Sequence, residues 1–292
     1  MVNELKIKAY AKLNLYLDMD GKRPNGYHNL NMIMQNISIC DEVDIEITHD
    51  RNIEIISSDK NVPLGEENIV YKAVKLFYSS CMQRFSGVKI NLDKHIPIQS
   101  GMGGGSADAA AVLVGLNSME GDIVPMARLL KMGEKLGADV PFAIVGGTCA
   151  VRGIGEIITP LKPLKDIYFV VIKPKAGIST AEAYKRIDDE NITIKDNFDE
   201  MVRATEYNDI LEMKKYMQNA FERVCNIPEV ELCKKSLLDE KAETAMMTGS
   251  GTAVFGIFKD KEKAEQAKEN LKKAFDWVYL AEPINEGVYF VL

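Results

Sequence analysis

The clearest pattern along the chain is an alternation of apolar and polar residues near its start. From Leu5 onward, apolar side chains occupy every odd position of residues 5–17, and mostly polar ones, among them Lys12, occupy the even positions. A period of two predicts a β-strand with one face in the core. Residues 24–26, Pro-Asn-Gly, predict a turn, and residues 31–47 predict a further strand.

Elsewhere apolar residues recur every three or four positions, which is typical of amphipathic helices. Glycine pairs and short alternating runs between these segments indicate strands and hairpins. We therefore expect helices at residues 68–85, 106–118, 125–136, 181–187, 199–223, 228–238 and 261–274, and strands at 88–92, 148–151, 156–159, 168–172, 245–248, 252–258 and 287–291. The mixture predicts an α+β protein.

A polar, proline-containing segment at residues 161–166 is the best candidate for a domain boundary. With 292 residues, the chain is long enough for two domains of ordinary size. We predict an N-terminal domain of residues 1–161 and a C-terminal domain of residues 162–292.

Composition excludes several classes of protein. A net charge of −7 argues against broad electrostatic binding of nucleic acid, although a local lysine cluster could still bind a small anion. Five cysteines without a C-x-x-C spacing, and three well-separated histidines, predict reduced thiols and no structural metal site. No apolar run approaches the ~18 residues of a membrane span, and no signal-peptide pattern is present. We expect a soluble, cytoplasmic protein with no membrane or nucleic-acid partner.

Four of the five residues 101–105 are glycines, directly before a predicted helix. Glycine permits left-handed backbone and close approach of another group, and helix-start amides favour a phosphate. No lysine lies between residues 97 and 108, which excludes a Walker A loop, and Ser106 replaces the last glycine of a dinucleotide fingerprint. A flexible turn is less favoured, because extra glycines cost ordering entropy. The loop therefore predicts a phosphorylated ligand held by amides and the Ser106 hydroxyl.

Because this loop has no lysine of its own, a phosphate bound there would need a cation from elsewhere in the chain. Lys12 and Asp139 each have a purely structural interpretation beside the functional one. Lys12 could neutralise a transferring phosphoryl group or simply face solvent, and Lys94 is a second candidate for phosphate contact. Asp139, two residues before Pro141, fits a helix N-cap. The same carboxylate could instead orient or deprotonate a hydroxyl beside a γ-phosphate.

Two further segments are ambiguous on their own. Tyr27 and His28 could be ordinary loop residues, or could stack on and hydrogen-bond a flat ligand such as a base. Residues 249–251, Gly-Ser-Gly, could form a hairpin turn or a second backbone wall of a phosphate cleft.

Taken together, these segments resemble the GHMP kinase superfamily. The matching segments are residues 9–15, 25–30, 97–110, 136–142, 146–147 and 248–251. The glycine loop and the last of these segments look like general signatures of the superfamily. The first two look specific to the branch that transfers the γ-phosphate of ATP to the 2-hydroxyl of a cytidine-diphosphate sugar alcohol, in the non-mevalonate route to isoprenoid precursors.

The resemblance implies a role for each matching residue. It implies that Lys12 and Asp139 are the catalytic pair. Binding of ATP is implied for Lys94, Pro97, Ile98, Gln99, Ser100, Gly101, Met102, Gly103, Gly104, Gly105, Ser106 and Ala107. Binding of the cytidine substrate is implied for Asn14, Tyr27, His28, Thr180 and Tyr184.

The resemblance also implies a fold and cofactors. It implies an N-terminal domain like the second domain of ribosomal protein S5, a ferredoxin-like C-terminal domain and a cleft between them. ATP and Mg²⁺ would be the cofactors, with no metal ligand assigned in the chain, and the protein would be a monomer or weak homodimer. The family usually has a second serine where this chain has Ala107, so one hydroxyl that could contact phosphate or Mg²⁺ is missing.

Two rival functions remain at this stage. One is a GHMP kinase for homoserine, mevalonate or a related alcohol, but these substrates have no base on which Tyr27, His28 and Tyr184 could stack. The other is a non-catalytic nucleotide sensor or RNA-binding protein, since the N-terminal fold also occurs in ribosomal proteins. Retention of Lys12 and Asp139, together with the acidic net charge, argues against it.

Overall fold

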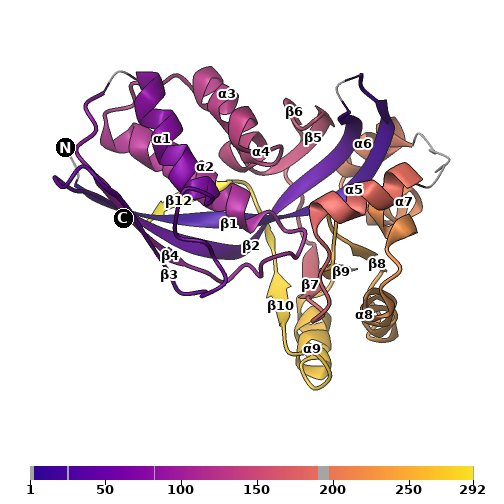
Figure 1. Cartoon of the computed structure of the whole chain (residues 1–292). Coiled ribbons are helices and arrows are strands. Elements are labelled where there is room, and N and C mark those ends of the chain that lie inside the picture. Colours follow the sequence, from indigo (N-terminus) through magenta and orange to yellow (C-terminus); the bar gives the residue numbers. More distant parts are fainter. Residues whose placement is uncertain (1–2, 25, 82, 190–196, 292) are drawn as a thin grey trace.

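A computed structural model describes residues 3–24, 26–81, 83–189 and 197–291, and these residues form two β-sheets flanked by helices (Figure 1). The large sheet contains β1 (Glu4–Lys22), β2 (His28–Ile47), β3 (Ile53–Ser57), β4 (Val88–Asp93), β5 (Thr148–Gly153), β6 (Ile157–Pro160), β11 (Pro283–Ile284) and β12 (Val288–Val291). Its main path runs β12-β1-β2-β4-β3, and β5 and β11 also pair with β2. All pairs are antiparallel except β3 with β4.

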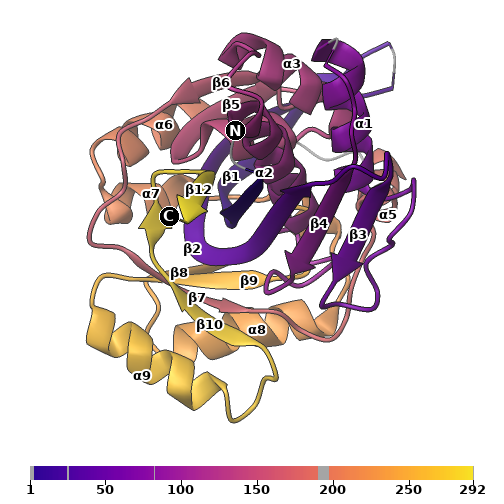
Figure 2. The ribbon, with the colours of Figure 1, turned by 90° about the vertical axis from the view of Figure 1, so that its left-hand side faces the viewer.

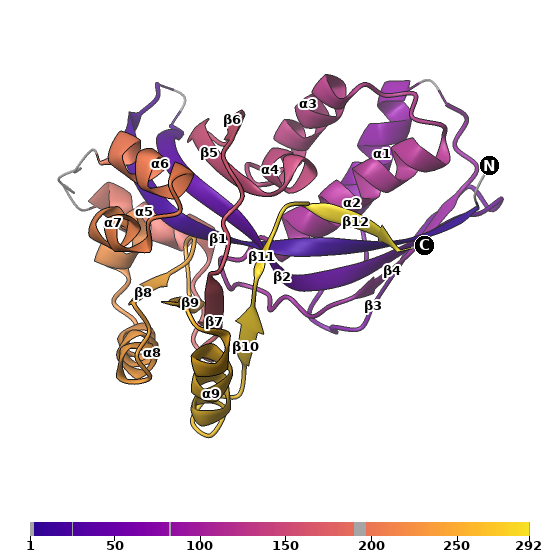
Figure 3. The same ribbon diagram turned by 180° about the vertical axis from the view of Figure 1, so that it is seen from behind.

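Four helices cover one face of the large sheet (Figure 3). They are α1 (Ile69–Cys81), α2 (Gly104–Met119), α3 (Met126–Leu136) and α4 (Val140–Val145). Helix α2 is apolar on nearly all sides, which is typical of a helix surrounded by other elements. Its Ala111 and Val112 pack in one core with Ile7 and Val43 of the sheet and Phe77 of α1.

The small sheet has the order β10-β7-β9-β8, antiparallel throughout. Its strands are β7 (Tyr168–Ile172), β8 (Thr244–Met247), β9 (Val254–Phe258) and β10 (Val278–Ala281). Helices α8 (Pro228–Asp239) and α9 (Lys261–Leu271) contact these strands (Figure 2). Chain order and strand order together give a ferredoxin-like β-α-β-β-α-β unit, which confirms the expected α+β architecture.

The segment between β7 and α8 differs from its prediction. One helix was expected over 199–223, but the structure has α6 (Phe198–Glu206), α7 (Ile210–Tyr216) and the 3₁₀ helix η1 (Ala220–Val224), after the separate helix α5 (Thr180–Asp189). Asn208 takes a left-handed conformation at φ 53°, and Asp209 and Asn219 cap the next two elements. The single-helix prediction was wrong because these polar side chains hydrogen-bond the backbone locally. Strands β3, β10 and β11 were not predicted.

The two sheets share part of their core. Leu13 of β1 and Ile33 of β2 pack in the same cluster as Phe169 and Phe255 of the small sheet. The predicted boundary after residue 161 falls between β6 and β7, but β11 and β12 return to the large sheet. The division into residues 1–161 and 162–292 therefore stays a prediction. Within the described ranges, no helix is long and apolar enough to cross a membrane.

Candidate active site

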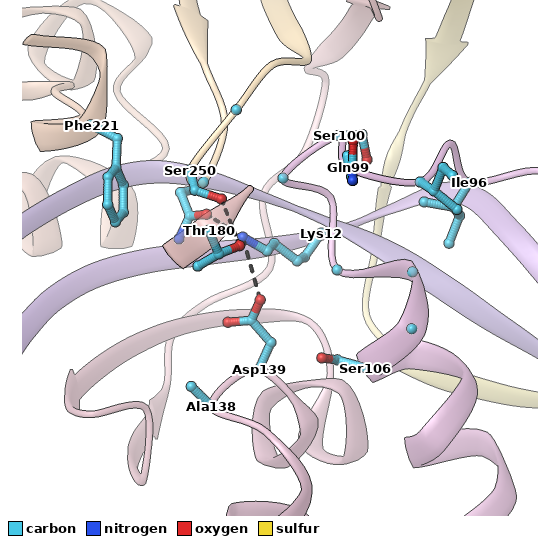
Figure 4. Close-up of a pocket in the computed structure, with 18 of the residues that line it drawn as sticks. Lys12, Ile96, Gln99, Ser100, Ser106, Ala138, Asp139, Thr180, Phe221 and Ser250 are labelled. Atoms are coloured by element: carbon cyan, nitrogen blue, oxygen red, sulfur yellow. Dashed lines mark hydrogen bonds and ion pairs between the residues drawn. The ribbon is translucent and has the colours of Figure 1, made fainter. Parts of the chain in front are cut away.

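A cavity of about 580 Å³ lies where β1, the glycine loop, α4 and α5 meet. Figure 4 shows Lys12 and Asp139 near its middle, with Phe221 on one side and Ile96 and Gln99 on the other. Most predicted site residues line it: Lys12, Asn14, Lys94, Pro97, Ile98, Gln99, Ser100, Gly101, Gly103, Gly104, Gly105, Ser106, Asp139, Thr180 and Tyr184. The cavity thus brings together residues from distant parts of the chain.

The glycine loop has the backbone that its sequence predicts. Gly101 and Gly103 have φ values of 78° and 74°, and Gly103 is the N-cap of α2. A Cβ at Gly101 would lie 2.1 Å from the carbonyl oxygen of Thr248. A side chain at this position would therefore require both left-handed backbone and a displaced neighbour.

The second glycine turn forms part of the cavity wall. Gly249, Ser250 and Gly251 connect β8 to β9, as the hairpin-turn reading expects, and they also line the cavity. That this wall faces a phosphate stays a prediction. Two hydrogen bonds join this region to its neighbours, Ala253 N to Ser100 O of the glycine loop at 3.0 Å and Asn14 N of β1 to Thr248 Oγ1 at 2.9 Å. A third, Lys12 N to Met102 O at 3.0 Å, joins β1 to the glycine loop directly. These bonds fix Lys12 relative to the loop.

Lys12 is buried at the floor of the cavity. Its side chain is 7% exposed, its Nζ donates to Asn14 Oδ1, and the same Nζ lies 3.7 Å from Asp139 Oδ2. Burial lowers the pKa of Lys12, and the Asp139 carboxylate opposes this shift. The solvated-face reading was therefore wrong, and so was the expectation of a half-buried strand beyond Ala11. Both faces of β1 are covered there because the small sheet packs on one, and Gly103 and Gly249 of the two glycine turns lie against Lys12 on the other.

Asp139 occupies the N-cap position of α4, as its spacing to Pro141 predicts, yet its carboxylate makes no capping hydrogen bond there. The side chain instead points toward Lys12 (Figure 4). A Cβ at Gly103 would lie 3.2 Å from Lys12 Cγ and 3.7 Å from Asp139 Oδ2, so the bare backbone of the loop lets the three groups meet. A cation, a carboxylate and the glycine loop therefore line the same part of the cavity.

Lys94 lines the cavity, but its ammonium is held by two carboxylates. It contacts Asp41 of β2, and its Nζ lies 2.5 Å from Asp108 Oδ2 of α2. Sequence reasoning missed Asp41 and Asp108, because one lies within a strand and the other among alanines of a helix. Neither has a local partner that would reveal the pairing.

The opposite end of the cavity is aromatic. Tyr184 and Phe221 line it, with their ring centroids 4.9 Å apart at 89°. His28 stacks on Tyr184 with ring centroids 5.4 Å apart at 19°, and its Nε2 lies 2.9 Å from Asp188 Oδ1. Burial raises the pKa of Tyr184 to about 12, which keeps its phenol neutral. Phe221 was hidden within the wrongly predicted helix over 199–223.

Four predicted site residues do not line the cavity. Met102 and Ala107 are buried in the core behind the glycine loop, so only their main-chain atoms could face a ligand there. Tyr27 is 60% exposed and lies outside the cavity. His28 does not line the cavity either, but it stacks on Tyr184, which does. Their proposed ligand contacts stay predictions.

Comparisons with known proteins identify the family of the chain. Residues 68–147 match the family described as GHMP kinases N terminal domain, and residues 198–276 match GHMP kinases C terminal. A 4-diphosphocytidyl-2-C-methyl-D-erythritol kinase of Alkaliphilus metalliredigens is 40% identical over 96% of this chain and 97% of its own length.

Solved structures show the same architecture. A crystal structure of 4-(cytidine 5'-diphospho)-2C-methyl-D-erythritol kinase, 28% identical, covers 95% of this chain and 98% of its own, with a TM-score of 0.78. Homoserine kinase from Cytophaga hutchinsonii superposes with a TM-score of 0.81 over 100% of this chain and 98% of its own, but at 21% identity it shows the fold alone. The chain therefore belongs to the 4-diphosphocytidyl-2-C-methyl-D-erythritol kinase family of the GHMP kinases.

Proposed function

We propose that the protein transfers the γ-phosphate of ATP to the 2-hydroxyl of 4-diphosphocytidyl-2-C-methyl-D-erythritol. The observation that carries the proposal is the meeting of Lys12 and Asp139, 3.7 Å apart, beside the glycine loop in one cavity. The activity named for relatives of 40% identity supports the choice of substrate.

ATP phosphates fit the glycine loop. Gly104, Gly105 and Ser106 open α2 at the cavity wall, where the first amides of a helix have no intrahelical partner. The positive end of the helix dipole adds to their attraction for an anion. The Ser106 hydroxyl is a further donor in the same wall.

Lys12 and Asp139 would divide the chemistry between them. Lys12 would stabilise the negative charge of the phosphoryl group during transfer, because a buried cation acts through a low local dielectric. Asp139 would orient the 2-hydroxyl and accept its proton. Phosphoryl transfer depends mostly on such positioning and charge stabilisation.

The site fits a divalent cation held largely by phosphate oxygens. No group of three or more His, Cys, Asp or Glu residues that could hold a metal occurs in the described part of the chain. Mg²⁺ commonly takes few protein ligands, together with substrate phosphates and water. The Ser106 hydroxyl, which lines the cavity, would be the protein ligand in place of the serine missing at Ala107. When bound, such a cation neutralises charge on the β- and γ-phosphates.

The aromatic end of the cavity suits the cytosine ring. Tyr184 and Phe221 offer flat apolar surface, and the Thr180 and Asn14 side chains add polar groups to the lining. A base bound there would lie on one side of the Lys12–Asp139 pair, and the residues of the glycine loop would lie on the other (Figure 4). In this arrangement acceptor and donor would lie on opposite sides of the reacting groups.

Mass-spectrometric detection of phosphate transfer tests the proposal directly. The purified protein would be incubated with ATP and Mg²⁺, with the cytidine-diphosphate substrate, homoserine or mevalonate as the alcohol. We expect a mass gain of one phosphate on the cytidine-diphosphate substrate and none on the other two. Transfer to homoserine or mevalonate alone would overturn the assignment in favour of another GHMP kinase activity. Tight RNA binding without any transfer would instead favour a non-catalytic role.

A further inference from the structure

A buried cluster of three charged side chains lies directly beneath the glycine loop. Asp41, Lys94 and Asp108 come from β2, from the segment after β4 and from α2, and their side chains are 0%, 5% and 4% exposed. The Lys94 ammonium contacts both carboxylates. The proposed phosphoryl transfer does not use this cluster.

The cluster holds both ends of the loop. Asp41 Oδ1 accepts hydrogen bonds from His95 N at 2.6 Å and Ile96 N at 2.8 Å, just before the loop begins. Asp108 lies one turn into α2, just after the loop ends. A Cβ at Gly104 would lie 3.4 Å from Asp41 Oδ2, so this carboxylate sits against the first residue of α2. The position of the phosphate-binding amides therefore depends on these three side chains.

The charges of the cluster do not balance when all three groups are ionised. Two carboxylates face one ammonium, and Asp108 Oδ1 is buried without a hydrogen-bond partner. Burial raises the pKa of Asp108 to about 7; the Lys94 ammonium opposes this shift and the Asp41 carboxylate adds to it. Burial alone would lower the pKa of Lys94, but the two carboxylates outweigh burial and raise it. Asp108 is thus the member that gains a proton, and the protonated cluster is neutral.

We propose that Asp41, Lys94 and Asp108 form a clamp that positions the glycine loop, and that ATP binds best when Asp108 in this clamp is protonated. The proposal rests on the proposed function, since ATP is its ligand. ATP would bring several negative charges into the cavity, which Lys94 lines and which the thin backbone of the glycine loop separates from the two carboxylates. A net negative cluster there would repel the phosphates through a poorly screened medium, and a neutral one would not.

The sign of the effect follows from linkage. As the pH rises through about 7, Asp108 ionises and the clamp becomes negative. Bound phosphate raises the pKa of Asp108 further, so ATP binding near neutral pH takes up a proton, to at most about one per ATP. By the same linkage the Kd for ATP rises by up to about tenfold between about pH 6 and pH 8, beyond the change caused by ATP's own ionisation.

Titration calorimetry of the full chain with ATP, without the alcohol substrate, measures this uptake. At about pH 7.5, runs in two buffers of different ionisation enthalpy give the number of protons bound per ATP. We expect uptake by the wild type and its loss in Asp108→Asn, whose amide keeps the shape and an oxygen for Lys94. The control is Asp44→Asn, which also removes one negative charge from β2. Because side chains alternate along a strand, Asp44 lies on the face of β2 opposite to Asp41. It should behave as the wild type.

A second variant protects the test against misfolding. Asp41→Asn keeps an oxygen that can accept from His95 N and Ile96 N, and it also removes the excess negative charge. We expect a folded protein by thermal unfolding, with no proton uptake. Equal uptake in the wild type and both folded variants would overturn the clamp and leave the cluster a purely structural feature. Absence of ATP binding by the wild type would instead overturn the proposed function.

Discussion

At the scale of single residues, Lys12 and Asp139 depend on each other. Burial disfavours the Lys12 ammonium, and the carboxylate 3.7 Å away compensates in part. A cation that is poorly hydrated and already fixed by Asn14 needs little reorganisation when charge develops beside it. In the proposed mechanism, the positive charge is therefore in position before the substrate binds.

Replacing Asp139 with asparagine should separate binding from turnover. We expect Asp139→Asn to lower kcat by about 10²- to 10⁴-fold, because the amide cannot accept the hydroxyl proton. The affinity for ATP should change little, since the loop amides remain. Steady-state kinetics and ATP titration measure the two effects. An unchanged kcat would refute the role of Asp139.

The lowered pKa of Lys12 predicts a limit to activity at high pH. In the proposed mechanism the protonated amine is the active form, so kcat/KM should fall as the pH rises through the pKa of Lys12 in the free enzyme, which lies below the ordinary 10.5. A pH profile of kcat/KM for ATP, corrected for the ionisation of ATP itself, measures this limb. A profile that stays flat up to about pH 10.5 would contradict the assignment of Lys12 as the essential cation.

At the scale of elements, the two glycine turns and α5 shape the cavity. The first turn packs against the second so closely that Gly101 leaves no room for a side chain. Helix α5 carries Tyr184 into the aromatic end and, one turn later, Asp188 toward the hairpin between β1 and β2. The residues that line the cavity thus depend on contacts between elements.

Gly101→Ala should damage both folding and ATP binding. The added Cβ would meet Thr248 O at 2.1 Å in a backbone with φ 78°, so we expect a loss of about 1–3 kcal/mol in the free energy of unfolding. Gly105→Ala is the matched control, because its Cβ would lie 3.6 Å from Ile69 Cγ2 in an ordinary contact. Denaturant unfolding should show a lower free energy of unfolding for Gly101→Ala and an unchanged one for Gly105→Ala. Equal stability of both variants would contradict the packing argument.

Asp188 should affect the cytidine substrate more than ATP. It contacts both His28 and Lys22, and so holds the β1–β2 hairpin against α5. We expect Asp188→Asn to raise the KM for the cytidine substrate about 2- to 5-fold, as the loss of a partly exposed ion pair would, with little change in the KM for ATP. Asp189→Asn, the next residue, is the control. A selective effect on ATP would contradict this placement.

Local patterns predicted much of the fold and part of the site. The period-two run predicted β1, and the glycine-rich segment predicted the N-terminal turn of α2. The pairing of Lys94 with Asp41 and Asp108 could not be predicted, because it arises from three elements far apart in the chain. Phe221 was missed for a similar reason, since its place in the wall depends on a capped 3₁₀ turn. Contacts between residues far apart in the chain, and interruptions of a helix by capping residues, do not change the periodicity of apolar residues enough to be predicted from it.

At the scale of the whole molecule, the two sheets are not independent layers. Strands β1 and β2 contribute to cores on both sides, and β11 and β12 return to the large sheet after the small one is complete. Gly287, just before β12, accepts a hydrogen bond from Tyr10 N at 2.9 Å and packs against Ala143 of α4. It therefore links the strand of Lys12 to the helix that follows Asp139.

Gly287→Ala should disturb the Lys12–Asp139 pair from a distance. Its Cβ would lie 1.8 Å from Ala143 O, so β12 or α4 must shift. We expect a lower melting temperature and a kcat reduced at least about tenfold, because small displacements of reacting groups cost rate. Gly121→Ala lies in a turn where a Cβ meets nothing within 4 Å but the backbone is left-handed at φ 86°, so it should lower stability without changing kcat and is the control for a general loss of stability. An unchanged kcat in Gly287→Ala would show that the link does not reach the catalytic groups.

The late return of β11 and β12 has a consequence for biosynthesis. While a nascent chain is still on the ribosome, β1 lacks its β12 partner and α4 lacks its Gly287 support until residues 283–291 have left the exit tunnel. Contacts between such distant residues form slowly, and unpaired strand edges invite association. The surroundings of Lys12 and Asp139 are therefore complete only after residues 283–291 have been translated.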